Sequence, residues 1–192
     1  PDPVPKPIKK TVGVDLGLTN LIATSDGTLV SPPKALRKSL RKLSRAQRKL
    51  ARRMKGGWNR LKQRRKVAKV HRTIERQRSD FLHKLSRKLV DENDGIVFEK
   101  LQVRNMVKNR HLSLSIADAG WSELVRMTTY KAEGAGGKVV LVDPAGTSQD
   151  CSACGANVPK GLAERTHQCP CGLVLDRDVN AARNILKRGL GE

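Results

Sequence analysis

The stretch TVGVDLG, residues 11–17, decides how the rest of the chain is interpreted. Its valines and its leucine alternate with a glycine and with Asp15, which is typical of a half-buried strand with a carboxylate on its second face. The residues that follow predict a strand at 21–25, a tight Asp-Gly turn at 26–27 and another strand at 28–30. The sequence therefore predicts a domain that opens with three short β segments.

Beyond this β segment the apolar residues change to a helical period. The leucines from Leu36 onward and Met54 predict one amphipathic helix, which the glycine pair at 56–57 ends. A second helical stretch continues to Leu89. The remaining elements are expected as a strand at 96–99 (IVFE), a helix at 116–133, a strand at 138–142 (KVVLV) and a last helix that Asp178 opens. This order of strands and helices predicts an α/β fold.

Positive charge is concentrated in one part of the chain. The 192 residues include 39 Lys and Arg against 18 Asp and Glu, a net charge of +21, and 18 of the cations lie between Lys34 and Ile74, where no acid occurs. Mutual repulsion would destabilise these helices unless a polyanion neutralised them, so the segment is predicted to bind a nucleic-acid backbone. Aromatic residues make up only 3%, which disfavours binding of single strands mainly by base stacking.

The contacts to phosphate are expected from cations on the two predicted helices and their connection. These are Arg45, Arg48, Arg52, Arg53, Lys55, Arg60, Arg64, Arg65, Lys69 and Arg72. Trp58 has two interpretations, stacking on a base or packing in the interior, and packing is the commoner role of a single Trp. A membrane-surface helix is the less favoured alternative, because the apolar faces are needed to pack the two helices together.

Three carboxylates interrupt or end predicted elements. Asp15 lies in the first strand, Glu99 ends the IVFE strand and Asp178 precedes the last helix. A charge in a buried strand is costly unless it is paired, hydrogen-bonded or bound to a metal. Each acid alone is expected to be a satisfied or surface residue, but the three together favour a shared site for Mg²⁺ or Mn²⁺. Beside a surface for nucleic acid, such a site predicts two-metal hydrolysis of phosphodiester bonds.

Four cysteines form two close pairs. Cys151 and Cys154 make a C-x₂-C pair, and Cys169 and Cys171 make a tighter C-x-C pair. Two pairs separated by a short loop predict a structural zinc site of four thiolates. His167 is an alternative ligand in place of one cysteine, and free thiols or an oxidised pair are the other interpretations.

Four segments, in this order, resemble the nuclease half of TnpB/OrfB proteins, the transposon-encoded relatives of compact type V CRISPR effectors. They are VGVDLGLTNLIA (12–23), IVFEKLQVRNM (96–106), TSQDCSACG…CPCG (147–172) and DRDVNAARNIL (176–186). The resemblance implies an RNase H-like (RuvC-type) mixed sheet with an inserted basic helical hairpin and a zinc ribbon. It also implies that Asp15, Glu99 and Asp178 are the catalytic, magnesium-binding acids. Asp178 is preferred to Asp176 because it lies two residues before an Asn-Ala-Ala sequence, as in the family's D-x-N-A-A pattern.

The resemblance further implies that Cys151, Cys154, Cys169 and Cys171 bind zinc, and it divides the chain into six parts. These are a linker or strand lead-in (1–10), nuclease part I (11–32), the hairpin insert (33–93), nuclease part II (94–146), the zinc ribbon (147–175) and nuclease part III with the C-terminal helix (176–192).

Family members use a guide RNA to cleave DNA, and base pairing supplies the sequence recognition. The resemblance thus implies a metal-dependent DNA endonuclease module with a DNA target and a guide RNA as partners. The chain starts with Pro1, about ten residues before the first predicted catalytic strand. We therefore expect the region that reads the target motif and grips the guide RNA to be absent.

Two other functions compete with the nuclease. One is a non-catalytic nucleic-acid-binding regulator derived from such a nuclease, and the other is a structural zinc-ribbon protein of an RNA–protein assembly. A derived regulator is expected to lose a catalytic acid, whereas all three are present. The sequence shows no apolar run long enough for a membrane span and no signal-peptide pattern, so we expect a cytoplasmic, nucleoid-associated protein.

Overall fold

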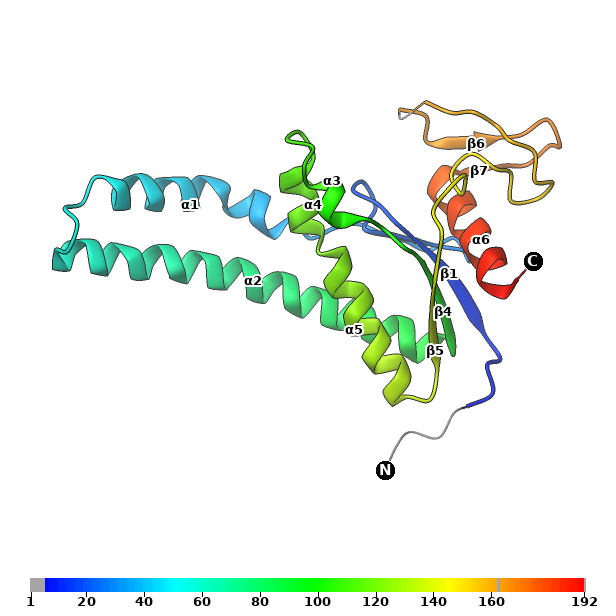
Figure 1. The fold of residues 1–192 in the computed structure, drawn as a ribbon, viewed down its shortest axis with the longest axis horizontal. Helices are drawn as coiled ribbons and strands as arrows, with labels where there is room; N and C mark the ends of the chain where they lie inside the picture. Colours follow the sequence, from blue (N-terminus) through cyan, green and yellow to red (C-terminus); the bar gives the residue numbers. More distant parts are fainter. Residues whose placement is uncertain (1–5, 162, 192) are drawn as a thin grey trace.

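The computed structural model describes residues 6–161 and 163–191. A five-stranded sheet forms its centre, with strand order β3-β2-β1-β4-β5 (Figure 1). Its strands are β1 (Thr11–Leu16), β2 (Ile22–Thr24), β3 (Leu29–Val30), β4 (Gly95–Glu99) and β5 (Lys138–Val142). The first three strands pair antiparallel, whereas β1, β4 and β5 run parallel. The predicted α/β class is therefore confirmed, and the sheet is mixed. Residues 6–10 precede β1 without regular structure, and residues 1–5 of the predicted lead-in lie outside the described residues.

The helices are α1 (Ala35–Ala51), α2 (Trp58–Glu92), α3 (Val103–Met106), α4 (Ser113–Ala119), α5 (Trp121–Gly134) and α6 (Arg177–Leu190). The end of α2 and the length of α5 lie on one side of the sheet, and α6 lies on the other (Figure 1). Alternation along the strands explains these layers, because successive side chains of a strand point to opposite faces. The apolar residues at even positions of β1 and β4 pack against α2 and α5; they include Val12, Val14, Ile96 and Phe98.

The opposite face of β1 carries Gly13 and Asp15, and α6 lies directly on it. A Cβ at Gly13 would overlap the carbonyl oxygen of Ala182, and a Cβ at Gly189 would overlap the side chain of Val97. Because glycine has no Cβ, these two residues let α6 approach the sheet closely. The same approach brings the first turn of α6 near the ends of β1 and β4.

The predicted single helix over 116–133 is wrong, because the chain forms two helices there. Gly120 separates α4 from α5 and has φ +70°, a left-handed conformation that favours glycine. Asp118, buried in α4, accepts hydrogen bonds from the amides of Leu36 (3.0 Å) and Arg37 (3.3 Å). It thereby caps the first turn of α1 from a distant part of the chain.

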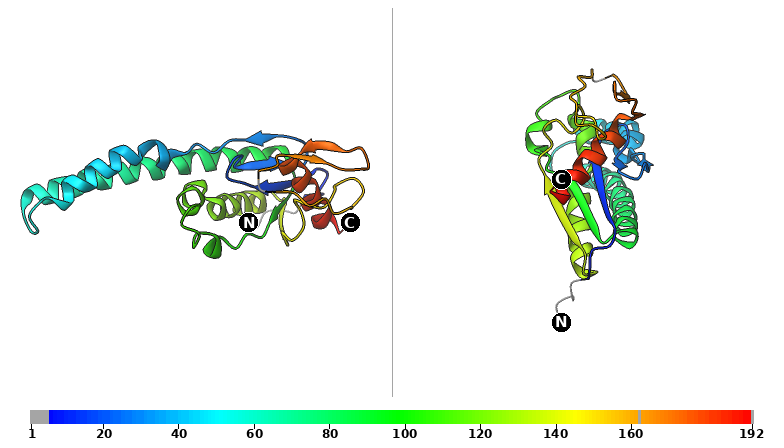
Figure 2. Two further views of the ribbon diagram at one scale, coloured as in Figure 1. Left: turned by 90° about the horizontal axis from the view of Figure 1, so that it is seen from above. Right: turned by 90° about the vertical axis from the view of Figure 1, so that its right-hand side faces the viewer.

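Helices α1 and α2 form an antiparallel hairpin that projects from the sheet (Figures 1 and 2). Its small interior contains Ala35, Leu43, Val70 and Ile74. Met54, predicted as part of the apolar stripe, lies beyond the end of α1 and is 80% exposed. The apolar contact between the helices therefore stops before the tip.

A small module of loops follows β5 and holds a two-stranded sheet of β6 (Thr166–Gln168) and β7 (Val174–Asp176). It lies beyond α6, on the side away from the hairpin (Figure 1). Among the helices of the described residues, none is long and apolar enough to cross a membrane.

Candidate functional site

Asp15 and Glu99 lie side by side on the sheet face that α6 covers. The parallel register pairs Val14 with Phe98, so the next residues of β1 and β4, Asp15 and Glu99, are also neighbours. Burial, together with the charges of Glu99 and Asp178, raises the pKa of Asp15 well above its usual value. The contact between the two side chains raises the pKa of Asp15 and lowers that of Glu99. The pair therefore favours a bound proton or a bound cation.

Glu99 is fixed by the backbone of the neighbouring strand. Its side chain is 7% exposed, and its Oε1 accepts a hydrogen bond of 3.2 Å from the amide of Leu16. Burial raises the pKa of Glu99, while the hydrogen bonds from Leu16 and Asp15 oppose this shift. The carboxyl of Glu99 is therefore held in place by the backbone of β1.

Asp178 approaches this pair from the first turn of α6. The helix begins at Arg177 with Asp176 as its N-cap, rather than at Asp178 as predicted. Oδ1 of Asp176 accepts from the amides of Asp178 (2.8 Å) and Val179 (3.3 Å). Asp176 is thus engaged in capping, whereas the charge of Asp178 acts on Asp15 and raises its pKa.

Two polar residues that the sequence did not single out contact Asp178. Nδ2 of Asn20 donates to its Oδ2 at 3.3 Å, and the guanidinium of Arg165 lies 4.0 Å from its Oδ1. Asn20 belongs to the turn between β1 and β2, and Arg165 belongs to the cysteine module. Sequence spacing gives no signal for either contact, because both depend on how distant segments pack.

The donor set of Asp15, Glu99 and Asp178 fits a hard divalent cation, because three carboxylates repel one another unless a cation separates them. Burial, followed by repulsion from Glu99 and Asp178, raises the pKa of Asp15, so the ionised acid is costly here without a cation. In the part of the chain that the structure describes, these carboxylates do not converge as tightly as the cysteine sulfurs do.

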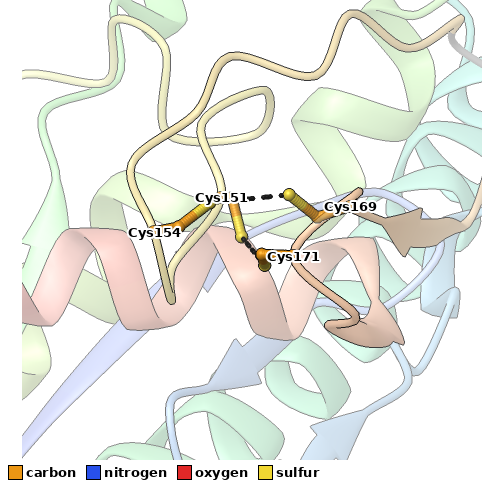
Figure 3. Close-up of side chains that lie close together, drawn as sticks. All are labelled: Cys151, Cys154, Cys169 and Cys171. Carbon is orange, nitrogen blue, oxygen red and sulfur yellow. Dashed lines mark hydrogen bonds between the residues drawn. The ribbon is translucent and has the colours of Figure 1, made fainter.

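The four cysteines meet at one point (Figure 3). The Sγ atoms of Cys151 and Cys171 are 3.7 Å apart, those of Cys154 and Cys169 are 3.6 Å apart, and all four lie within 4.8 Å of one another. A tetrahedral ZnS₄ centre with Zn–S bonds of about 2.3 Å requires separations of about 3.8 Å. The sulfur positions therefore fit zinc, and the tight C-x-C pair reaches the same geometry as the C-x₂-C pair.

Protonation of the cysteines also favours a cation among them. Burial raises the pKa of Cys151, but the amides of Cys154 and Ala153 lower it to about 5. The Cys171 amide lowers the pKa of Cys169, but burial and the neighbouring thiols raise it to about 12. Four thiolates at this spacing need a metal to coexist.

His167, the alternative ligand, is fully buried on β6 but is not one of the four converging side chains. Its Nδ1 contacts the ammonium group of Lys160. His167 is therefore not part of the converging group of sulfur atoms.

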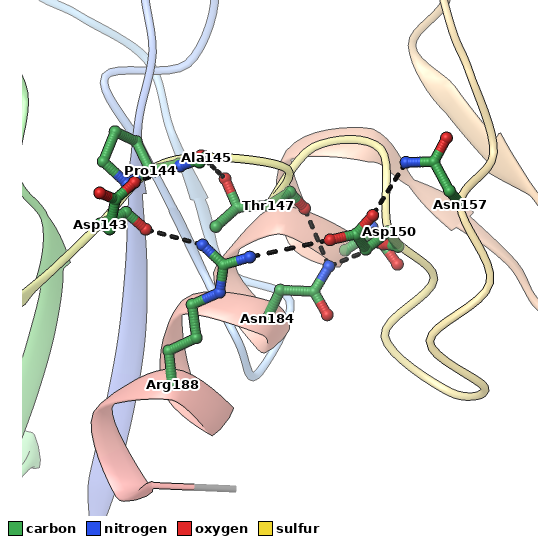
Figure 4. Close-up of polar contacts among 9 residues, drawn as sticks. Asp143, Pro144, Ala145, Thr147, Asp150, Asn157, Asn184 and Arg188 are labelled. Carbon is green, nitrogen blue, oxygen red and sulfur yellow. Dashed lines mark hydrogen bonds and ion pairs between the residues drawn. The ribbon is translucent and has the colours of Figure 1, made fainter.

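Polar side chains on one face of α6 attach the cysteine module to the sheet (Figure 4). Asn180 donates to the Asp150 carbonyl at 2.8 Å and accepts from the Ser152 amide at 2.9 Å. One turn later, Asn184 donates to the carbonyls of Thr147 (2.8 Å) and Asp150 (2.7 Å). A further turn on, Arg188 donates to the Asp143 carbonyl at 2.8 Å. The helix that carries Asp178 is thus also the support of the cysteine pair at 151–154.

Between α1 and α2 lies a groove of about 370 Å³ with five cations and no acid in its lining. Its residues are Lys42, Arg45, Ala46, Lys49, Gln63, Lys66, Lys69, Val70 and Thr73. Of the ten cations predicted from the sequence, Arg45 and Lys69 line this groove. Lys42, Lys49 and Lys66 were not among them, because their common face appears only once the two helices pack.

The other predicted cations lie outside the groove. Arg60 is half-buried, and its guanidinium donates to the carbonyls of Leu50 (3.0 Å) and Arg53 (3.1 Å), so it holds the hairpin together. The exposed ones are Arg48, Arg52, Arg53, Lys55, Arg64, Arg65 and Arg72. Except for Arg60, the predicted cations are thus accessible to a polyanion.

Two family models match the chain. A family described as "Probable transposase" (OrfB, IS605 type) matches residues 1–110, and a Cas12f1-like TNB domain matches residues 121–185. The chain belongs to the OrfB (TnpB-like) transposase family. This confirms the resemblance that the four sequence segments indicate.

Two OrfB-family relatives are similar over most of the chain. A protein of Streptomyces pristinaespiralis named "Putative RNA-guided DNA endonuclease" is 47% identical over 185 residues, which is 93% of this chain and 45% of the relative. InsQ of Escherichia coli K12, named in the same way, is 38% identical over 200 residues, which is 95% of this chain and 50% of InsQ. The chain therefore spans about half the length of these relatives.

A solved structure shares the fold of this OrfB-family chain. It is Cas12f1 in a complex with sgRNA and target DNA, with a TM-score of 0.64 over 95% of this chain and 50% of Cas12f1. Sequence identity is 18%, so this likeness concerns the fold.

Proposed function

We propose that this chain is the metal-dependent endonuclease module of a TnpB-like, RNA-guided nuclease. The observation that carries the proposal is the placement of Asp15 and Glu99 as neighbours beneath Asp178, with a raised pKa of Asp15 as the consequence. The names of the two relatives support nuclease chemistry, and the strand order 3-2-1-4-5 supports an RNase H-like, RuvC-type sheet. A target DNA and a guide RNA are the proposed partners.

The proposed parts of the chain keep the boundaries expected from the sequence. Nuclease parts I (11–32), II (94–146) and III (176–192) enclose a helical insert (33–93) and a zinc ribbon (147–175). The four cysteines would hold zinc as a structural ion. The predicted cations other than Arg60, together with the walls of the groove, would hold the nucleic-acid backbone.

Asp15, Glu99 and Asp178 would hold Mg²⁺ or Mn²⁺. Ions bound there supply an activated water and stabilise the leaving oxygen of the phosphodiester. The protein orients the acids: the Leu16 amide fixes Glu99, and Asn20 fixes Asp178. Arg165 places a positive charge 4.0 Å from Asp178, where it would attract a substrate phosphate.

Cleavage assays with the Asp15→Ala variant test this function. Wild-type protein and variant are incubated with labelled single-stranded DNA and Mg²⁺, both alone and with guide RNA and the remaining half of a relative. We expect cutting by the wild type and a loss of at least 100-fold in the variant, in the range of lost metal-ion catalysis. Asp80→Ala removes an exposed acid of α2 and should cut normally. Equal cutting by Asp15→Ala, or no cutting by the wild type in any mixture, would falsify the proposal.

A further inference from the structure

The tip of the α1–α2 hairpin exposes a large aromatic side chain. Trp58, the first residue of α2, is 79% exposed, and the interpretation of this residue as a packing residue is therefore wrong. The other tryptophan, Trp121, is 3% exposed, and its Nε1 donates to the carbonyl of Gly17 at 3.2 Å. An indole left in water adds little to the free energy of folding, and its ring is available to a partner outside this chain.

The tip is an ordered turn rather than a loose end. Gly56 has φ +83°, which favours glycine, and the Gly57 amide donates to the Met54 carbonyl at 3.3 Å. From the first turn of α2, Arg60 donates to the carbonyls of Leu50 in α1 and of Arg53 just beyond it. Trp58 is therefore presented on a prepared support, so that binding requires little ordering of the backbone.

Charge around the tip selects the class of partner. Lys55, Arg52 and Arg53 flank the turn, and no acid occurs between Lys34 and Ile74. A polyanion is attracted to this surface, whereas a second copy of the hairpin is repelled. Nucleic acid is the polyanion that also offers flat aromatic rings, and a nucleobase stacks well on an indole.

We infer that Trp58 is a stacking platform for one unpaired nucleobase of the nucleic acid whose backbone lies on the hairpin. This inference rests on the proposed function and adds a base contact to the phosphate contacts. Stacking reads no particular base, since every base has a π face. One such residue agrees with the low aromatic content, because phosphate contacts still dominate the affinity.

The test compares strands with and without bases. The full chain is titrated with 12-nucleotide single-stranded DNA, the matching RNA, and a DNA of equal length that carries only abasic sites. Binding is followed by anisotropy of a terminal dye and by tryptophan emission. Trp121 is buried, so a change in emission on binding reports on Trp58. The DNA and RNA arms show which of the two supplies the base.

We expect Trp58→Ala to weaken binding of the intact strand about five- to 100-fold, as removal of one base-stacking ring does. Trp58→Tyr should restore most of the affinity. On the abasic strand the wild type and Trp58→Ala should bind equally. Met54→Ala is the matched control, because Met54 is equally exposed on the same turn but has no ring, and it should bind like the wild type.

Three results would overturn the inference. The first is binding of intact DNA and RNA by Trp58→Ala within twofold of the wild type. The second is an equal loss of affinity in Trp58→Ala for intact and abasic strands, which would mean that the indole contacts the sugar-phosphate backbone and not a base. The third is self-association or binding to anionic vesicles that Trp58→Ala abolishes while strand binding persists. A failure of the proposed function appears differently, as DNA cutting that does not depend on Asp15.

Discussion

The backbone amide of Ser152 donates a hydrogen bond of 2.9 Å to Oδ1 of Asn180. Ser152 lies between the first two cysteines, and Asn180 lies two residues after Asp178 on α6. The cysteine cluster and the candidate catalytic helix are therefore joined by a buried contact. The Asn of the D-x-N-A-A pattern thus has a structural explanation: it attaches the cysteine module to the helix that carries the third acid.

Loss of one cysteine should remove the metal and loosen α6. In Cys154→Ser, whose side chain is exposed, we expect a loss of about one equivalent of zinc and faster amide exchange over residues 178–188. Exchange in the middle of α1 should not change, because the hairpin lies on the side of the sheet away from the module. Metal analysis and hydrogen-exchange mass spectrometry measure both effects. Unchanged zinc content would refute the ligand assignment.

Replacement of Asn180 removes the contact between the cysteine module and α6 but removes no metal ligand. Asn180→Ala leaves the Ser152 amide without its partner and should lower the free energy of unfolding by about 1–3 kcal/mol. Zinc content should stay at one equivalent, while any Mg²⁺-dependent cutting should fall. Lys187→Ala, an exposed change on the same helix, is the control for α6 itself. Wild-type stability of Asn180→Ala under denaturant would contradict the buried contact.

The raised pKa of Asp15 predicts how stability depends on pH. Because the folded state holds this proton more tightly than the unfolded state, the stability it contributes is complete below the usual pKa of about 3.9 and is lost as pH rises through the raised value. Asp15→Asn should therefore be more stable than the wild type at pH 8 without divalent ions, by about 2–4 °C in Tm per kcal/mol of repulsion removed. At pH 3 the two proteins should be alike.

The effect of divalent ions on Tm is a second test of the raised pKa of Asp15. Mg²⁺ should raise the Tm of the wild type at pH 8, because it neutralises the repelling carboxylates, and should leave Asp15→Asn nearly unchanged. Thermal unfolding at several pH values, with and without Mg²⁺, measures both trends. If Tm changes with pH in the same way in the wild type and in Asp15→Asn, the pKa of Asp15 is not the one that is raised.

The groove between α1 and α2 predicts which cations contact phosphate. Replacing Lys42, Lys49, Lys66 and Lys69 with glutamine should reduce the slope of log affinity against log salt by about 3, because each phosphate that is no longer neutralised lowers it by about 0.7–0.9. The matched control neutralises Lys38, Arg41, Lys62 and Arg76, four cations of the same helices outside the groove. Fluorescence titration with duplex and single-stranded DNA at several salt concentrations gives the slopes. Equal slopes for the two quadruple variants would place the binding surface elsewhere.

Local patterns in the sequence were enough to predict individual strands. Alternation around Asp15 and the apolar IVFE segment identified two strands, and the structure shows that these two strands are neighbours. The adjacency of Asp15 and Glu99 follows from that pairing. The catalytic and zinc-binding roles stay predictions, which the experiments above test.

Features that depend on distant segments could not be predicted. Gly120 divides the expected helix with a left-handed backbone, at a place where an added Cβ would lie only 3.1 Å from the side chain of Leu82 of α2. Asn20 and Arg165 reach Asp178 from segments far apart in sequence. Exposure of Trp58 follows from where the hairpin interior ends, and no local pattern records this.

Helix α2 runs from the tip of the hairpin to the sheet as one rod. It has 35 residues and contains neither glycine nor proline, so it is about 52 Å long and has no built-in hinge. Leu82, Leu85 and Leu89, near its far end, lie in the same core as β1 and β4. A rotation of about 10° at that end sweeps the tip through about 9 Å. One uninterrupted helix thus connects the tip of the hairpin to the core that packs on the strands of Asp15 and Glu99.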